Sequence, residues 1–162
     1  MELYLYLAGG LFNAGERLHN LYLEKYLKLL GYKVILPQRE ALKFFDGSLF
    51  DIKAIVADCK AKSCDKSNLY IGSIDGADAN SGGSIEYGMA IISTGRAIIY
   101  RTDFRTALDR ELGVNAMFGA EGTKFLYEPC FFTELEQVDD YYRGLASRID
   151  LMIREIIYVC HH

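Results

Sequence analysis

The sequence predicts a single-domain α/β fold, in which a mostly parallel, five-stranded sheet has helices on both faces, as in doubly wound proteins of the flavodoxin or Rossmann type. Short apolar runs alternate along the chain with longer segments of helical periodicity, which is typical of a parallel sheet. The length of 162 residues suits one domain, and the 51% hydrophobic and 25% charged residues are typical of globular proteins. Residues 1–160 contain no repeat or linker, so we expect one domain.

Short apolar runs bounded by turn-forming residues predict the strands. These runs cover residues 3–8, 32–37, 69–74, 96–100 and 124–128. Gly9-Gly10 ends the first run and Pro37 ends the second. Glycine lets the backbone turn and approach a neighbour closely, and proline removes an amide donor, so both residues are expected at strand ends.

Segments with apolar residues three or four positions apart lie between the strands and predict helices. One helix begins near Asn13 and ends before Gly31, a common C-terminal signal. Ser84 is expected to cap a second helix, which ends before Gly95 and has Glu86 in its first turn.

The remaining segments give weaker signals. Residues 38–48 are predicted to form a loop or a short helix, and residues 50–57 the beginning of another helix. Thr133 is expected to cap the C-terminal helix, with Glu136 completing a capping box, and this helix should run to about Val159.

The overall charge and hydropathy exclude several classes of function. The formal net charge of −4 disfavours nucleic-acid binding, which usually needs a basic surface, but it does not exclude uncharged nucleosides. The longest apolar runs have about six residues, too few to span a membrane. The acidic start lacks the basic and apolar regions of a signal peptide. We therefore expect a cytoplasmic protein that binds neither nucleic acid nor membrane.

The glycine and cysteine patterns predict no cofactor and no metal. Gly9-Gly10 is followed by Gly15, so the Gly-x-Gly-x-x-Gly pattern of dinucleotide sites is absent, as is the Gly-Lys-Ser/Thr phosphate loop. The cysteines are spaced unlike zinc ligands and are expected to be reduced thiols: Cys59, Cys64, Cys130 and Cys160. The closing His161–His162 pair is either native or a tag remnant, and we leave it out of the chemistry.

The stretch from residue 75 to residue 90 is the strongest candidate for a site. It joins the end of a buried strand to the start of a helix, which is where open α/β sheets bind ligands. It contains Asp75, Asp78, Asn80 and Glu86. An ionised glutamate at a helix N-terminus suits attack on a sugar C1 or stabilisation of an oxocarbenium ion, and it equally suits a capping role.

The other polar residues also have two interpretations. Asp75 either binds a ligand or forms a turn before Gly76. Asp58 either caps a helix or serves as a ligand contact or proton donor. Tyr6 points either into the core or towards a ligand. His19 is the only histidine outside the C-terminal pair and is expected to be solvated or half-buried, so a histidine-based triad is not expected.

Three segments resemble the nucleoside 2-deoxyribosyltransferase family, most closely its protozoan branch. Residues 5–12 read Leu-Tyr-Leu-Ala-Gly-Gly-Leu-Phe, similar to the family's Ile-Tyr-x-Ala-Gly-x-x-Phe. Residues 75–90 are similar to the family's Asp…Asp-x-Gly-Thr-x-x-Glu-x-Gly-x-Ala. Residues 114–117, Val-Asn-Ala-Met, are similar to its Asn-x-Met segment. The likeness covers the chain from residue 3 to about residue 117.

The resemblance implies a role for each matching residue. Glu86 would attack C1′ of a 2′-deoxynucleoside and hold the deoxyribosyl group covalently until a second nucleobase replaces the first, with retention. Tyr6 would orient this nucleophile, and Asp58, or alternatively Asp65, would protonate or bind the departing base. Asn115 would reach a neighbouring subunit's site, which implies a homo-oligomer with shared sites. The substrate-binding residues would be Gly9, Phe12, Gln38, Asp75, Asn80, Gly82, Ser84, Asn115 and Met117.

The sequence departs from the family pattern at three positions. Asn80 replaces the family's base-contacting aspartate, and an amide both donates and accepts where a carboxylate only accepts. Gly83 replaces a threonine or serine, and Gly10 stands where proline is common. Two other functions therefore stay open: an N-glycosidase acting on deoxynucleosides or their 5′-monophosphates, and a nucleoside-binding module without catalysis.

Overall fold

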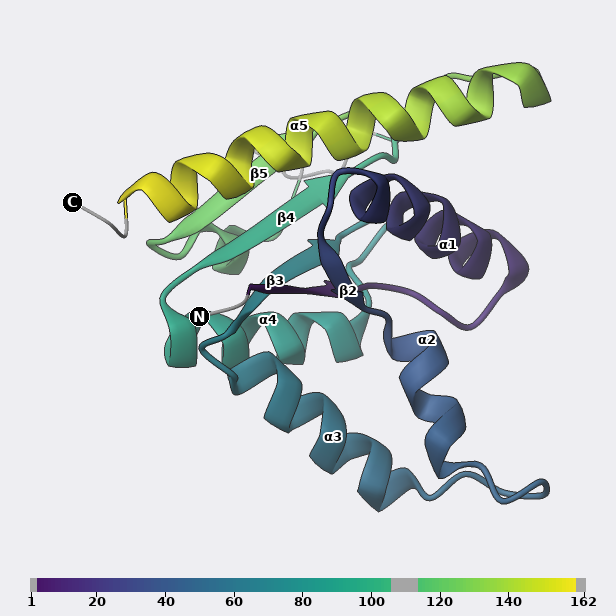
Figure 1. Cartoon of the computed structure of the whole chain (residues 1–162), viewed down its shortest axis with the longest axis vertical. Helices are drawn as coiled ribbons and strands as arrows, with labels where there is room; N and C mark the ends of the chain where they lie inside the picture. The colour runs from purple at the N-terminus through teal and green to yellow at the C-terminus, as the bar shows by residue number, and fades with distance from the viewer. Residues whose placement is uncertain (1–2, 106–113, 160–162) are drawn as a thin grey trace.

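The computed structural model describes residues 3–105 and 114–159 and contains a five-stranded sheet in the order β2-β1-β3-β4-β5 (Figure 1). All its neighbouring strands are parallel. The strands are β1 (Tyr4–Ala8), β2 (Lys33–Ile35), β3 (Asn68–Ser73), β4 (Ala97–Arg101) and β5 (Thr123–Tyr127). The predicted fold class is confirmed, and each strand lies within about two residues of the run that predicted it.

Helices cover both faces of the sheet. The α-helices are α1 (Ala14–Leu29), α2 (Pro37–Glu40), α3 (Ile52–Cys64), α4 (Ser81–Thr94) and α5 (Val138–Val159). The short 3-10 helices are η1 (Ala41–Phe44), η2 (Ala116–Gly119) and η3 (Leu135–Gln137). In Figure 1, α1 and α5 lie on one face of the sheet, and α3 and α4 lie on the other.

The alternation of side chains along β1 divides the core into two layers. Leu5 and Leu7 pack with the apolar faces of α1 and α5. Tyr6 and Ala8 point to the opposite face and pack with Tyr87 and other residues of α4. Tyr6 therefore lies in the core, only 1% exposed, on the side of the sheet where α4 begins.

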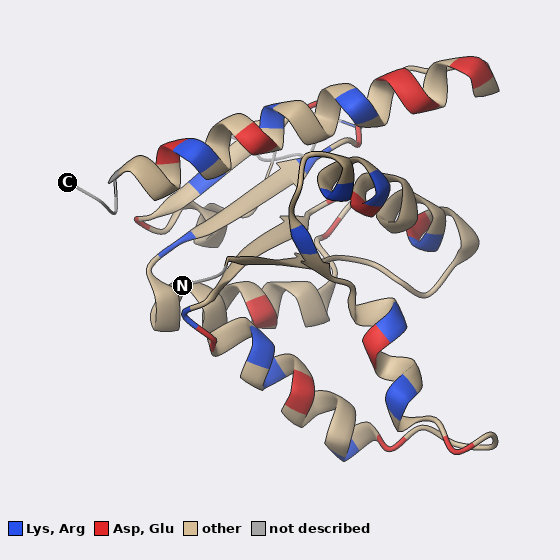
Figure 2. Cartoon of the chain, viewed as in Figure 1, with Lys and Arg blue, Asp and Glu red and all other residues tan. Residues whose placement is uncertain are grey.

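Charged residues gather on the outer surfaces of the helices, as Figure 2 shows most clearly for α5. The inner face of α5 contributes fully buried side chains, among them Leu145, Ile149 and Ile153. This alternation is the pattern of a surface helix packed on a sheet. Within residues 3–105 and 114–159, no helix is long and apolar enough to cross a membrane.

The start of α4 differs from its prediction. The cap is Asn80, whose side chain accepts a hydrogen bond from the Gly83 amide at 3.0 Å, and the helix begins at Ser81. Ser84 lies inside the helix and donates its hydroxyl proton to the Asn80 carbonyl at 2.9 Å. Glu86 therefore lies in the second turn, where the field of the helix terminus is weaker than in the first.

The start of α5 also differs. The capping box consists of Glu134 and Gln137, which together open η3, and α5 follows from Val138. The backbone amide of Thr133 donates to the Gln137 side chain at 2.8 Å, so Thr133 lies just outside the box. The predicted box was thus misplaced by one residue, because Thr-x-x-Glu and Glu-x-x-Gln overlap in this stretch.

The weakly predicted region forms α2, η1, a hairpin and α3. Phe45 and Phe50 pair across the hairpin, and their ring centroids lie 4.7 Å apart. Asp51 caps α3 by accepting from the Ala54 amide at 3.0 Å. Asp58 lies in the middle of α3 and caps nothing, so that interpretation was wrong.

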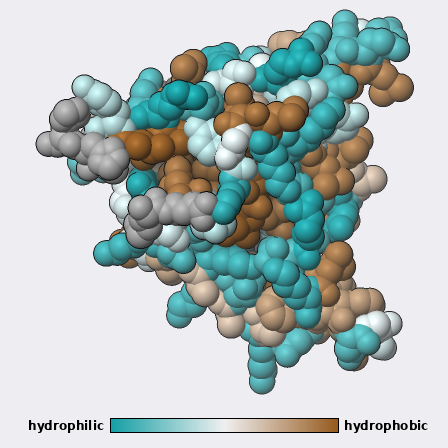
Figure 3. All heavy atoms as spheres, viewed as in Figure 1, coloured by the Kyte–Doolittle hydropathy of each residue, from teal (hydrophilic) through white to brown (hydrophobic). Residues whose placement is uncertain are grey.

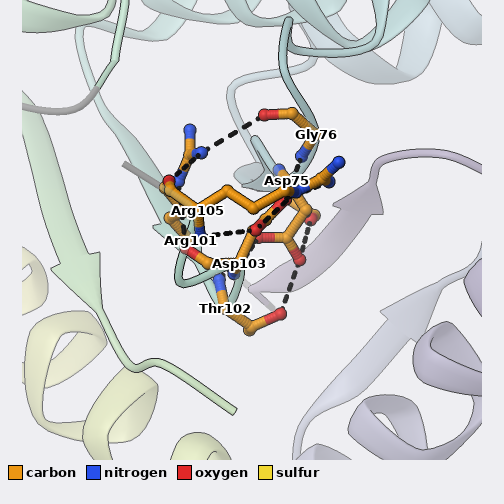
Figure 4. Close-up of polar contacts among 7 residues, drawn as sticks. Asp75, Gly76, Arg101, Thr102, Asp103 and Arg105 are labelled. Atoms are coloured by element: carbon orange, nitrogen blue, oxygen red, sulfur yellow. Dashed lines mark hydrogen bonds and ion pairs between the residues drawn. The ribbon is translucent and has the colours of Figure 1, made fainter. Parts of the chain in front are cut away.

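A polar network joins the loop after β3 to the end of β4 (Figure 4). The Asp75 carboxylate accepts hydrogen bonds from the Thr102 amide and hydroxyl, both at 2.6 Å, and from the Asp103 amide at 2.8 Å. The Gly76 amide donates to Asp103, and Arg101 donates to the Gly76 carbonyl. Asp75 therefore holds the start of the loop in place by satisfying three donors of the neighbouring strand end.

Replacing Asp75 by alanine should lower the free energy of unfolding by about 1–3 kcal/mol, because three donors lose a charged acceptor. Urea denaturation monitored by circular dichroism would measure the loss. The matched control is Asp78→Ala in the same loop, at an exposed position, which should change stability by no more than about 0.5 kcal/mol. Equal stability of the two variants would show that the network contributes nothing.

Candidate active site

A cavity of about 590 Å³ opens at the carboxyl edge of the sheet. Its walls come from the loop after β1, from α2 and η1, from the hairpin and α3, and from the first turns of α4. Figure 3 shows hydrophobic atoms at the surface in the lower part of the view, where α2, α3 and the hairpin lie. The apolar wall includes Leu11, Phe12, Leu42, Phe50, Ile55 and Val56.

Glu86 contributes the carboxylate of this cavity. It is the only charged residue of α4. The hydroxyl of Tyr6 donates a hydrogen bond to Glu86 Oε1 at 2.9 Å. A residue of β1 and a residue of α4 thus meet beside the cavity.

The electrostatics of this pair suit a nucleophile. Burial raises the pKa of Glu86, and hydrogen bonds from Tyr6 and Cys59 act in the opposite direction. Burial, followed by the nearby Glu86 charge, raises the pKa of Tyr6 well above its ordinary value, so its hydroxyl stays protonated and remains a donor. The carboxylate is therefore held by protein donors and little hydrated, which strengthens its interaction with a developing positive charge.

Five of the nine predicted substrate-binding residues line the same cavity as Glu86. They are Gly9, Phe12, Gln38, Asn80 and Gly82. Gly9 has a φ of +152°, and a β-carbon there would lie 3.1 Å from the side chain of Ser73. A side chain at this position would strain the backbone and crowd Ser73, which explains the glycine.

Protein contacts already orient the two amides of the cavity. Gln38 is buried, accepts from the Asn20 side chain at 3.0 Å and donates to the Arg17 carbonyl at 3.2 Å. Asn80 uses its side-chain oxygen to cap α4, so its Nδ2 is the atom that can donate into the cavity. Each amide is therefore held in one orientation before a ligand arrives.

The predicted proton donors lie elsewhere. Asp58 forms an ion pair with Lys62 at 2.6 Å, and Lys62 also pairs with Glu40 at 2.6 Å. Asp65 is the C-cap residue that follows α3, and it accepts from the amide and hydroxyl of Ser67. Neither aspartate belongs to the wall of the cavity that contains Glu86.

Four of the predicted substrate-binding residues also lie outside this cavity. Asp75 belongs to the network with Thr102, and Ser84 bonds to the backbone of its own helix. Asn115 accepts from the Met117 amide at 3.0 Å at the start of η2, and both residues are exposed. Within one chain, therefore, Asn115 and Met117 do not contribute to the cavity of Glu86.

Sequence reasoning missed Cys59 and the apolar face of α3. Ile52, Ile55, Val56 and Cys59 follow the i, i+3, i+4, i+7 spacing of one helix face, and all line the cavity. That spacing is visible in the sequence, but the helix was predicted from residue 50 and was not assigned a buried face. The cysteine was considered only as a structural or metal-binding residue.

A second, polar cavity of about 430 Å³ lies beside the first, and Asn80 lines both. Its wall includes Glu16, Asp75, Asp78 and His19. The ring nitrogens of His19 lie 2.8 Å from the Tyr100 hydroxyl and 2.9 Å from the Tyr142 hydroxyl, and burial lowers the pKa of the half-buried imidazole. In the part of the chain that the structure describes, no group of three or more histidine, cysteine or acidic residues could hold a metal.

Comparisons with known proteins agree with this geometry. The model of the nucleoside 2-deoxyribosyltransferase family matches residues 5–122. A conserved protein from Enterococcus faecalis V583 has a similar structure, with a TM-score of 0.60, 19% identity, and coverage of 89% of this chain and 99% of that one. No curated protein sequence matches the chain.

A 2-deoxyribosyltransferase from Bacillus psychrosaccharolyticus is a second structural neighbour, with a TM-score of 0.56 and 20% identity over 85% of this chain and 91% of that one. At these identities the two structures support the fold. The family match spans most of the chain, including the Tyr6 strand and the Glu86 helix. The chain belongs to the nucleoside 2-deoxyribosyltransferase family.

Proposed function

We propose that this protein moves 2-deoxyribose from a deoxynucleoside to another nucleobase, through a covalent deoxyribosyl intermediate on Glu86. The observation that supports this proposal most directly is the Tyr6–Glu86 hydrogen bond of 2.9 Å beside a cavity of about 590 Å³. A cavity of this size is in the range that holds small ligands. Family membership supports the reaction class of a pentosyltransferase.

The first half of the reaction forms a glycosyl ester. The free oxygen of Glu86 attacks C1′, and the bond between C1′ and the base nitrogen breaks, with its electron pair leaving on the base. Positive charge develops on the sugar ring in the transition state, where the nearby carboxylate stabilises it. Tyr6 holds Oε1 through its hydrogen bond, so Oε2 is the oxygen that we assign to the attack.

The second half reverses these bonds with a new base. A nitrogen of the incoming base attacks C1′, the ester bond breaks, and its electron pair returns to Glu86. The incoming base loses a proton and the departing base gains one, so the complete exchange releases no proton. Two displacements at one carbon give net retention of configuration.

The apolar wall supports recognition of a nucleobase. Phe12 and Phe50 provide aromatic faces at the cavity, and base stacking on such a side chain contributes about 1–3 kcal/mol. Asn80 and Gln38 provide amide groups that are already oriented. Since the Asn80 side-chain oxygen caps α4, its Nδ2 is left to donate to an acceptor atom of a base.

We further propose that the active form is a homo-oligomer in the cytoplasm. Asn115 and Met117 are exposed and lie outside their own chain's cavity, which supports a role in a neighbouring subunit's site. The free thiols of Cys59, Cys64 and Cys130 support a reducing compartment.

A second candidate function is hydrolysis of a deoxynucleoside 5′-monophosphate. Arg17 favours it, since among the described residues lining the main cavity it is the one cation and could bind a phosphate. The second cavity opposes it, because Glu16, Asp75 and Asp78 place carboxylates beside Asn80. We therefore favour the free nucleoside as substrate.

Replacing Glu86 by glutamine should reduce base exchange by at least about 10³-fold, because an amide does not form the ester. Burial raises the pKa of Glu86, so ionising it at neutral pH costs folding stability. The neutral variant should therefore be at least as stable as the parent near pH 7, and this advantage should disappear below the unfolded-state pKa of about 4.3.

Chromatography of a purine deoxynucleoside mixed with a second base would measure the exchange, and thermal denaturation at both pH values would measure stability. Near-normal exchange in Glu86→Gln would exclude the assigned nucleophile. Free sugar and base without an exchanged nucleoside would exclude a transferase.

Arg17→Gln separates the two candidate substrates. If the monophosphate is the substrate, the variant should raise its KM by about tenfold or more while changing the KM of the nucleoside much less. We expect instead that the parent prefers the nucleoside and that the variant leaves the ratio of the two kcat/KM values nearly unchanged. A parent enzyme that prefers the monophosphate would overturn our choice of substrate.

Co-expression of Glu86→Gln with Asn115→Ala tests shared sites. Each variant alone should have little activity. In a dimer with shared sites, a mixed pair contains one site with both native residues, so an equal mixture should recover about a quarter of the parent activity. Activity no higher than the mean of the two separate variants would show that Asn115 does not serve a neighbouring site.

A further inference from the structure

Cys59 occupies the position on α3 that faces the proposed nucleophile. The cavity face of this helix consists of Ile52, Ile55, Val56 and Cys59. Asp58 is one residue earlier, about 100° around the helix axis. Its carboxylate pairs instead with Lys62, one turn later on the adjacent face. The helix phase therefore presents a thiol, and not a carboxylate, to Glu86.

The thiol is part of a compact polar cluster. It lies beside both the Glu86 carboxylate and the Tyr6 hydroxyl, and its presence lowers the pKa of the Glu86 carboxyl. Tyr6 donates its only proton to Glu86 at 2.9 Å, and the thiol has one proton of its own that can serve the same carboxylate. Cys59 is half-buried, with the cavity on one side and α4 on the other. Three elements, β1, α3 and α4, thus each supply one member of the cluster.

We propose that Cys59 is a positioning residue for the transfer reaction: its protonated thiol orients the Glu86 carboxylate and keeps the base side of the cavity free of a second negative charge. This inference rests on the proposed function of Glu86. It also assigns a group beside the base, a position for which the sequence offered only Asp58 or Asp65.

The surrounding groups explain why a neutral thiol matters. Tyr6 and Cys59 contact the carboxylate of Glu86, Tyr70 lies behind it in the core, and Arg17 is the cation on the cavity wall. Burial raises the pKa of Cys59, so it remains a thiol at neutral pH. A carboxylate in its place would repel the Glu86 charge and favour protonation of the nucleophile.

The dependence of kcat on pH tests the orienting role, since only ionised Glu86 can attack. Cys59→Ala removes a donor to the carboxylate, so the acidic limb of the profile should move to higher pH by about half a unit. Cys59→Ser keeps a donor and should restore the limb to its parent position. Cys59→Asp adds a like charge and should move it upward by about one unit or more.

Cys64→Ala is the matched control, because Cys64 ends the same helix outside the cavity wall. Its profile should coincide with that of the parent. Thermal denaturation of all four variants would identify any that is misfolded, and Cys59→Ser is the smallest change. A Cys59→Ala profile identical to that of the parent would overturn the proposal, as would an equal displacement in Cys59→Ser.

A labelling experiment separates this proposal from the proposed function, because it needs no turnover. Iodoacetamide at about pH 8.5 would be applied to the Glu86→Gln protein with and without a deoxynucleoside, and mass spectrometry would compare labelling of Cys59 and Cys64. The nucleoside should slow labelling of Cys59 at least about fivefold and leave Cys64 unchanged. Protection without base exchange in the parent would place Cys59 at the ligand and reject only the transferase. Equal labelling with and without nucleoside would reject the position of Cys59.

Discussion

The hydrogen bond between Tyr6 and Glu86 joins the first strand to the helix that follows the third strand, and it depends on the whole arrangement of the sheet. The two residues are 80 positions apart in the chain, and they meet because β1 lies beside β3 and α4 packs back over both. A buried hydroxyl and a half-buried carboxylate would each be costly without a partner. Each satisfies the other, so the core and the site share one contact.

The fold was largely predictable because its central strands, β1, β3 and β4, are buried on both faces and therefore appear as unbroken apolar runs. Helix starts were less predictable where several residues could cap. Asn80 and Ser84 are both good caps, and Ser81, Gly82 and Gly83 between them favour helix only weakly. Tertiary contacts decide the outcome, since Tyr70 donates its hydroxyl proton to the Gly83 carbonyl at 2.8 Å and so holds this first turn in place.

In the candidate site, the residues that belong to a short sequence motif could be predicted. The residues that depend on which side of a helix faces the cavity could not. Tyr6 and Glu86 belong to short segments whose neighbours identify them. The contribution of α3 depends on which side of the helix faces α4, and an error of one position exchanges a paired surface aspartate, Asp58, for the cavity residue Cys59. Asp75 could not be assigned from the sequence for a similar reason, because its partners Thr102 and Asp103 lie 27 and 28 residues away, just after β4.

The neutral surroundings of Glu86 are consistent with exchange more than with hydrolysis. During exchange, the departing base gains one proton and the incoming base loses one. The cavity therefore needs a path for a proton, but it needs no permanent strong acid. The Asn80 Nδ2 group and the Cys59 thiol can donate hydrogen bonds without adding charge. The apolar wall around Phe12 and Phe50 would favour a flat base over water at the proposed intermediate. Glu86 is the one anion among the described residues that line this cavity. The affinity of the apolar wall for a nucleobase would therefore decide whether a base or water attacks C1′.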